Sequence, residues 1–272
     1  IGTYAFSGCS SLPSIIIPDL VRAVNVYSFQ NCTSLTSVYI GSSVTLVDQY
    51  AFYNCSKLPN ITIPNAVTAI GIQAFNACSK LTSISLGTGL LSIGDNAFLN
   101  DVSLNSLIIP NSVTSIGTAM LSGCSGITDV SIGNSVKSID SYAFQYMPFQ
   151  NLTLPASLTN IGQGGFYQAK IKNLVVQDMS SITLGLSALV LASGPETLIY
   201  DSSALFISTS FSFISSLSFV ITDIDFTTPY LFQFKRCQCP AKSRHVQRLS
   251  FQAQVPTQRR HGASSSWNSH RL

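Results

Sequence analysis

Charged residues and histidine are scarce in this chain of 272 residues. Only 9% of the residues are Asp, Glu, Lys or Arg, against about 25% in an ordinary soluble domain. The first histidine is His245, which excludes Ser-His-Asp and Cys-His catalytic arrangements from everything before it. No apolar stretch reaches the roughly 18 residues of a transmembrane helix without polar interruption, because serines break even the richest one, LFISTSFSFISSLSFVI. We therefore expect neither an enzyme nor a membrane span.

The few charges are divided unevenly along the chain. All 11 acidic residues lie between Asp19 and Asp225, together with only six basic ones. From Thr227 onward the chain has eight Lys or Arg, no acidic residue and all 3 histidines. The periodic pattern described below stops near Phe226 as well. We expect residues 227–272 to be a basic tail that is either disordered or the product of a reading-frame error, and we expect no nucleic-acid partner for it.

What the chain does have is an aromatic or large aliphatic residue at nearly constant spacing. The first five members of this aromatic column recur about every 23 residues, and internal periodicity of this length is typical of repeat architectures. Every later interval lies within one residue of the same period. The ten members are Phe6, Phe29, Phe52, Phe75, Phe98, Leu121, Phe144, Phe166, Leu189 and Phe213.

Two further columns repeat with the first. A cysteine column lies three residues after the aromatic column, at Cys9, Cys32, Cys55, Cys78 and Cys124, with Asp101 and Met147 in the remaining places. A leucine column lies three residues further on, at Leu12, Leu35, Leu58, Leu81, Leu104 and Ile127. These intervals of three residues favour a short 3₁₀-like or helical turn with all three columns on its inward face.

A short strand is predicted after each leucine. The segments Ile15–Ile17, Val38–Ile40 and Ile61–Ile63 alternate inward and outward positions and are rich in β-branched residues, as expected for a strand with one buried face. Pro18 or Gly41 ends the strand, because proline lacks the ladder donor and glycine frees the backbone to turn. One such unit cannot bury its own apolar face, so stacking of the units is obligatory.

The repeat can be written I-x-I-P-x-x-V-x-x-I-G-x-x-A-F-x-x-C-x-x-L. This pattern resembles the BspA-like, or Treponema pallidum type, leucine-rich repeats from Ile1 to about Phe226, and most closely through Leu154. We therefore predict a leucine-rich repeat solenoid over residues 1–226, regular over 1–166 and degenerate over 167–226. About ten turns, each of roughly 22–24 residues, should form one long parallel β-sheet with short 3₁₀ or helical return turns.

The resemblance also implies a class of function. Proteins of this kind are typically secreted or lie on the cell surface, and they are implicated in adhesion to host matrix proteins and to other cells. An extracellular or cell-surface location and protein partners are therefore expected. The family brings no catalytic residue and no cofactor to this chain.

The cysteine column has a second interpretation, as a metal ladder or a row of disulfides. Adjacent turns bring Cα atoms within the roughly 4.4–6.8 Å that a disulfide requires. Met147 occupies a place in the same column, however, and neither a metal ligand nor a bridging cysteine would be replaced by methionine. We expect buried, reduced thiols and no metal site. Cys237 and Cys239 of the tail lack the second ligand pair of a zinc site.

The outward positions of the predicted strands form the candidate binding face. They are small, polar and almost uncharged, with a few exposed apolar members that could anchor a large partner. The predicted protein-binding residues are Ile16, Tyr39, Asn60, Thr62, Ser85, Ile108, Asp129 and Ser131. The favoured function is a non-catalytic adhesion or protein-interaction module. The alternative is a structural wall or scaffold protein without a specific ligand.

Overall fold

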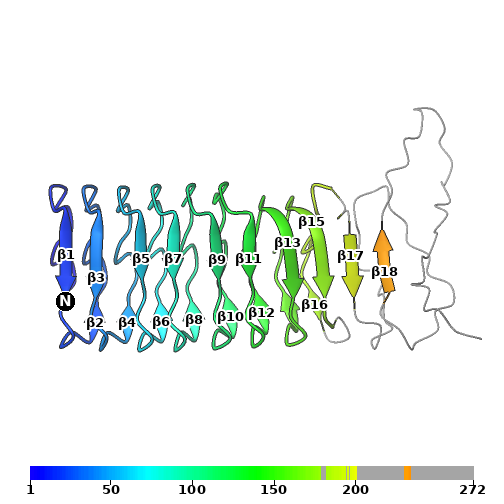
Figure 1. Ribbon diagram of the computed structural model, residues 1–272, viewed down its shortest axis with the longest axis horizontal. Helices are drawn as coiled ribbons and strands as arrows, with labels where there is room; N and C mark the ends of the chain where they lie inside the picture. The colour runs from blue at the N-terminus through cyan, green and yellow to red at the C-terminus, as the bar shows by residue number, and fades with distance from the viewer. Residues whose placement is uncertain (179–181, 194, 196, 201–229, 234–272) are drawn as a thin grey trace, which may run out of the picture. The chain divides into compact units, whose positions relative to one another are not determined.

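The chain winds into a solenoid in which every turn carries one longer and one shorter β-strand (Figure 1). The computed structural model describes residues 1–178, 182–193, 195, 197–200 and 230–233. Seven turns from β1 to β15 are described without a gap. The last predicted turn, at Phe213, the boundary between residues 226 and 227, and most of the predicted tail lie outside the described residues. The leucine-rich repeat solenoid predicted from the period is confirmed, with fewer described turns than ten.

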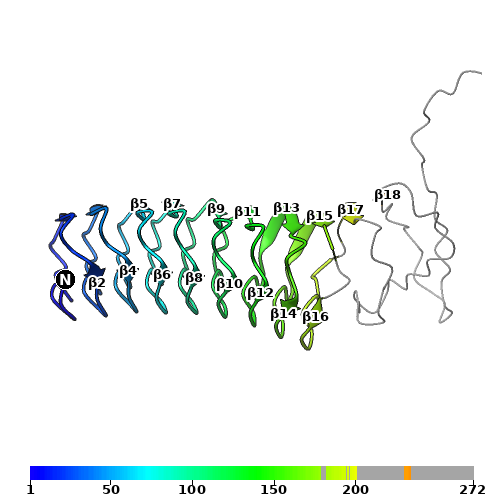
Figure 2. The ribbon, with the colours of Figure 1, turned by 90° about the horizontal axis from the view of Figure 1, so that it is seen from below.

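The longer strands form one side of the solenoid and the shorter strands lie away from it, as the turned view shows (Figure 2). The longer strands are β1 (Ser14–Ile17), β3 (Ser37–Ile40), β5 (Asn60–Thr62), β7 (Ser83–Ser85), β9 (Ser106–Ile108), β11 (Asp129–Ser131), β13 (Pro148–Leu154), β15 (Lys170–Val176) and β17 (Thr197–Tyr200). The shorter strands are β2 (Ala23–Val24), β4 (Leu46–Val47), β6 (Ala69–Ile70), β8 (Ser92–Ile93), β10 (Ser115–Ile116), β12 (Ser138–Ile139), β14 (Asn160–Ile161) and β16 (Thr183–Leu184). Four residues of the predicted tail, β18 (Tyr230–Gln233), pair antiparallel with β17.

The strands do not make the single long sheet that the sequence predicted. The shorter strands form a parallel sheet of their own, eight strands long, and the longer strands divide into β1–β3, β5–β7 and a larger sheet from β9 to β18. Pro59 accounts for the division between β3 and β5. At the equivalent position Thr36 and Thr82 each donate a backbone N–H to the preceding turn, at 2.8 Å in both cases, and proline has no N–H to donate.

The return turns are neither the 3₁₀ nor the helical turns that were predicted, since the described residues contain no helix. From Tyr27 to Cys32 the backbone N–H groups alternate. Those of odd-numbered residues donate to the next turn of the solenoid at 2.8–3.0 Å, and those of even-numbered residues donate to the carbonyl three residues earlier at 3.2 Å. Tyr27 and Asn31 have φ angles of 58° and 59°, and the equivalent pair recurs in the other turns. Left-handed residues four apart prevent the three-residue bonds from joining into a helix.

The core is a set of columns that run along the solenoid axis. The aromatic column is buried from Phe29 to Leu189. Its rings stack between turns with centroids 5.2 Å apart for Phe29–Phe52, 5.4 Å for Phe52–Phe75 and 5.7 Å for Phe75–Phe98. Offset stacks of this kind add about 0.5–1.5 kcal/mol to the burial of each ring. The inward residues of both strands, such as Ile61 and Ile70, cover the other edges of the rings.

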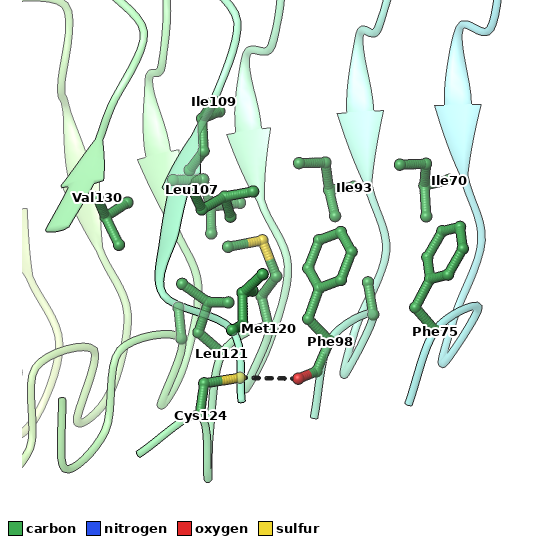
Figure 3. Close-up of a cluster of buried hydrophobic side chains, with 14 of the residues drawn as sticks. Ile70, Phe75, Ile93, Phe98, Leu107, Ile109, Met120, Leu121, Cys124 and Val130 are labelled. Carbon is green, nitrogen blue, oxygen red and sulfur yellow. Dashed lines mark hydrogen bonds between the residues drawn. The ribbon is translucent and has the colours of Figure 1, made fainter. Parts of the chain in front are cut away.

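One turn replaces the usual Ala-Phe pair with Met120-Leu121, and both residues are fully buried. Leucine is smaller than phenylalanine and methionine is larger than alanine, so the two changes conserve volume together. Figure 3 shows Met120 and Leu121 next in line after the rings of Phe75 and Phe98. The flexible methionine fills the space that a ring would have occupied.

The turns after Met147 are built differently. The interval from Asp129 to its partner Asn151 is one residue shorter than that from Ser106 to Asp129, and the missing residue belongs to the turn that follows the cysteine column. This segment becomes extended and joins the strand, so β13 and β15 are seven residues long. Phe149, in the extended part, packs edge-on against Phe144 at 5.7 Å and so takes the place of the lost leucine column.

Candidate binding face, cysteine column and tyrosine corner

The eight predicted binding residues all lie exposed on the side formed by the longer strands. Six of them take the third position of their strands and two, Asn60 and Asp129, take the first position. The strand register brings Ile16 opposite Tyr39, Thr62 opposite Ser85, and Ile108 opposite Ser131. The structure therefore assembles the predicted set into two rows that run along the solenoid axis.

Three apolar side chains on this face are exposed and do not contribute to the core. Ile16, Tyr39 and Ile108 are 73%, 52% and 70% exposed, whereas the residue between the two rows in each strand, such as Ile61 or Leu107, points inward. Most of the remaining face carries hydroxyl and amide groups. Such a surface offers hydrogen bonds and a few apolar anchors without a strong field of either sign.

The first-position row extends beyond the predicted residues. Asp129 pairs in register with Asn151, and the amide nitrogen of Asn173 donates to the amide oxygen of Asn151 at 2.9 Å. Asn151 and Asn173 were not among the predicted site residues, because the predicted set ended at Ser131, before the less regular turns that follow Met147. The face thus continues with amides from β13 to β15.

The cysteine column is buried as expected in four turns, and Cys9 is exposed. Each buried thiol donates to the backbone carbonyl of the aromatic residue 26 positions earlier. The sulfur–oxygen distances are 3.1 Å for Cys32, 3.3 Å for Cys55, 3.2 Å for Cys78 and 2.9 Å for Cys124. Burial raises the pKa of the Cys32 thiol to about 11 and raises that of Cys78 well above its ordinary value. The column is therefore a row of neutral thiol donors.

Asp101 occupies the cysteine column between Cys78 and Cys124 and is fully buried. Neither carboxyl oxygen has a hydrogen-bond partner among the described residues. Burial raises the pKa of Asp101 well above its ordinary value, and the nearby backbone amide of Cys78 opposes part of that rise. Burial therefore favours the neutral form of this carboxyl group, which is also the form that can donate a hydrogen bond as a thiol does.

No group of three His, Cys, Asp or Glu residues in the described part of the chain is arranged to hold a metal ion. Within the same residues no helix is long and apolar enough to cross a membrane.

A column of tyrosines at one corner of the return turns was missed from the sequence, although its period is visible there. The rings of Tyr4, Tyr27 and Tyr50 stack on one another with centroids 4.7 Å apart in both pairs. All three residues are left-handed, with φ between 56° and 58°. Tyr142 holds the same position further along, and Tyr146 and Tyr167 lie near it with rings 6.1 Å apart. We call this side the tyrosine corner.

The comparison with known families decides the identity of the repeat. The BspA type leucine rich repeat region matches in six copies, over residues 1–128 and 114–240. This chain belongs to the BspA-type leucine-rich repeat family. No curated protein is similar to the chain by sequence.

Solved structures of bacterial leucine-rich repeat proteins share the fold. A leucine-rich repeat protein from Bacteroides ovatus is 25% identical, with a TM-score of 0.53, over 74% of this chain and 58% of the other. A leucine rich cell surface protein from Faecalibacterium prausnitzii is 30% identical, with a TM-score of 0.55, over 62% of this chain and 48% of the other. The chain therefore spans about half the length of these two proteins.

Proposed function

We propose that this chain is a non-catalytic adhesion module that binds proteins through the side formed by its longer strands. The observation that carries the proposal is the exposure of Ile16, Tyr39 and Ile108 in the third-position row of an otherwise polar, almost uncharged face. Covering one isoleucine or tyrosine side chain contributes about 1.5–3 kcal/mol to a complex, and the hydroxyls and amides around it supply the polar rim of an interface.

The shape of this face favours a large partner. The two rows of side chains run across many turns of the described chain, and extended solenoid faces of this kind recognise macromolecules rather than small molecules. The Faecalibacterium relative is described as a cell surface protein, which supports an extracellular or cell-surface location for this chain. Extracellular matrix proteins and cell-surface proteins are the partners we infer.

The test compares point variants in the full chain. Ile16→Asn and Ile108→Asn remove two anchors, and Leu20→Asn is the matched control because Leu20 is 92% exposed in the loop after β1, away from the two rows. Binding is measured on immobilised extracellular matrix proteins and on fixed cells. We expect each face variant to weaken binding roughly tenfold, as loss of one anchor of about 1.4 kcal/mol requires, and the control to bind like the native chain.

The alternative is a structural wall or scaffold protein, and the same experiment separates the two. A native chain that binds none of these surfaces, or face variants that bind as well as Leu20→Asn, would leave the scaffold function as the better account.

A further inference from the structure

A pocket of about 520 Å³ opens on the tyrosine corner, away from the strand face. Its lining residues are Tyr142, Gln145, Gln163, Tyr167 and Ser187. This volume falls within the roughly 300–1,000 Å³ of small-molecule pockets, and the hollow is open to solvent on one side.

The pocket lies where small residues take the tyrosine position of the column. In the first turns Tyr4, Tyr27 and Tyr50 stack on one another, and Gln73, Asn96 and Ala119 hold the same position in the middle turns. After Tyr142 the same position is taken by Gly164 and then Ser187, both left-handed like the tyrosines, with φ of 61° and 58°. A Cβ atom on Gly164 would lie 2.5 Å from the Cε1 atom of Tyr142. The Tyr142 ring therefore leans over the glycine, and the small residues leave the space beyond it open.

The lining combines two phenol rings with two side-chain amides. The side chains of Gln145 and Gln163 make no hydrogen bond to any described residue, so both amides can bind a ligand. An amide supplies two donors and an acceptor, and a phenol supplies one hydroxyl that both donates and accepts. None of the five residues carries a carboxylate, an amine or a guanidinium group, so the lining offers no opposite charge to a phosphate or to another charged ligand.

We propose that this pocket binds a neutral carbohydrate, such as the end of an uncharged glycan chain. A sugar ring has an apolar face of C–H groups that packs on an aromatic ring, and its rim of hydroxyls matches paired donors and acceptors. The Tyr142 and Tyr167 rings supply the packing surfaces, and Gln145 and Gln163 supply the polar contacts. This site is independent of the protein-binding face and lies on a different side of the solenoid.

The experiment applies the full chain to an array of neutral, sialylated and sulfated oligosaccharides, and then measures the affinity for the best neutral glycan by calorimetry. Tyr142→Ala removes a packing surface. Gly164→Tyr restores the column and closes the pocket, at a φ that four tyrosines of the same column already adopt. Tyr50→Ala is the matched control, because it removes a tyrosine of the column far from the pocket.

We expect the native chain and Tyr50→Ala to bind a neutral glycan equally, and Tyr142→Ala and Gly164→Tyr to bind it about tenfold more weakly. The melting temperature of Tyr142→Ala should stay close to native, whereas Gly164→Tyr also has to displace the Tyr142 ring from its place over the glycine. Undiminished binding by Gly164→Tyr would overturn the proposal. So would a preference for sialylated or sulfated glycans, or no binding of any neutral glycan at millimolar concentration. Capture of proteins through this corner alone would also overturn it.

Discussion

The thiol sulfur of Cys124 lies 2.9 Å from the carbonyl oxygen of Phe98, the ring residue of the preceding turn. The cysteine side chain of one turn is thus hydrogen-bonded to the backbone of the turn before it. Only a protonated thiol can make this bond, since a thiolate has no hydrogen to donate. The buried positions of the cysteine column therefore require side chains that are uncharged in the folded chain.

Alkylation should distinguish the buried and exposed members of the column. Burial raises the pKa of the Cys78 thiol and removes it from solvent, whereas Cys9 is exposed. Because the thiolate is the reactive form, we expect iodoacetamide at pH 8 to label Cys9 quickly and Cys78 only after unfolding in denaturant. Peptide mass spectrometry of the native and unfolded chains measures both rates. Equal native labelling of the two residues would show that the column opens to solvent.

The stability of the solenoid should fall as the pH rises above about 4, through Asp101. The pKa of this carboxyl is raised well above its ordinary value of 3.8 in the folded chain, so the folded state holds a proton that the unfolded state releases. The full stability is present below the ordinary pKa and is lost as the pH rises towards the raised one. The free energy of unfolding should decrease by up to about 1.4 kcal/mol per pH unit in this range.

Asp101→Asn should flatten this pH dependence and stabilise the chain at neutral pH, because the amide is neutral and can donate to a backbone carbonyl. Urea denaturation between pH 4 and 8 measures the effect. Asp129→Asn, on the exposed strand face, is the control and should keep the native slope. If Asp101→Asn keeps that slope too, then another group is responsible for it.

The Met120-Leu121 pair should behave as a coupled unit. Met120→Ala leaves a cavity and Leu121→Phe overfills the same layer, so each single change should cost about 1–3 kcal/mol. The double variant restores the Ala-Phe pair of the other turns and should lie within about 1 kcal/mol of the native chain. Chemical denaturation of the four proteins gives the coupling energy. Additive losses would mean that the two side chains do not share one space.

Left-handed positions should respond to glycine in the opposite way from the rest of the turn. Ala77 has a φ of 63°, a conformation that costs a residue with a Cβ about 1–2 kcal/mol. Ala77→Gly should therefore stabilise the chain by about 1 kcal/mol, whereas Ala74→Gly, in the same turn but buried and not left-handed, should destabilise it by a similar amount. Thermal melts of both variants test this, and a loss of stability in Ala77→Gly would contradict it.

The solenoid and its inward columns could be predicted because burial repeats with the sequence. Phe75, Cys78 and Leu81 recur at fixed intervals, and a fixed interval of apolar residues determines which side of each turn faces the core. The return turn could not be predicted in the same way. Intervals of three residues fit a helix, and the left-handed backbone at Gln73 and Ala77 has no signal in those side chains.

The strand face was predictable for a related reason, and the pocket was not. Strand alternation places Thr62 and Ser85 outward once Ile61 and Ile84 are assigned to the core side. The pocket depends on the small residues that follow Tyr142 in the column, Gly164 and Ser187, and on the Tyr142 ring that leans over Gly164. The column position and the orientation of that ring are known only from the structure.

Parallel pairing of the shorter strands continues without a break from β2 to β16, so each interior strand of that sheet is bonded in the same way to the turn before it and to the turn after it. Ser115 pairs with Ser92 on one side and with Ser138 on the other, each exactly one repeat away along the chain. An insertion or deletion of one whole turn therefore leaves two unchanged surfaces to join, whereas a change of one residue has to be absorbed by rebuilding a turn, as happened after Met147. Insertion or deletion of complete turns should therefore change the length of the solenoid with the least disturbance to its core.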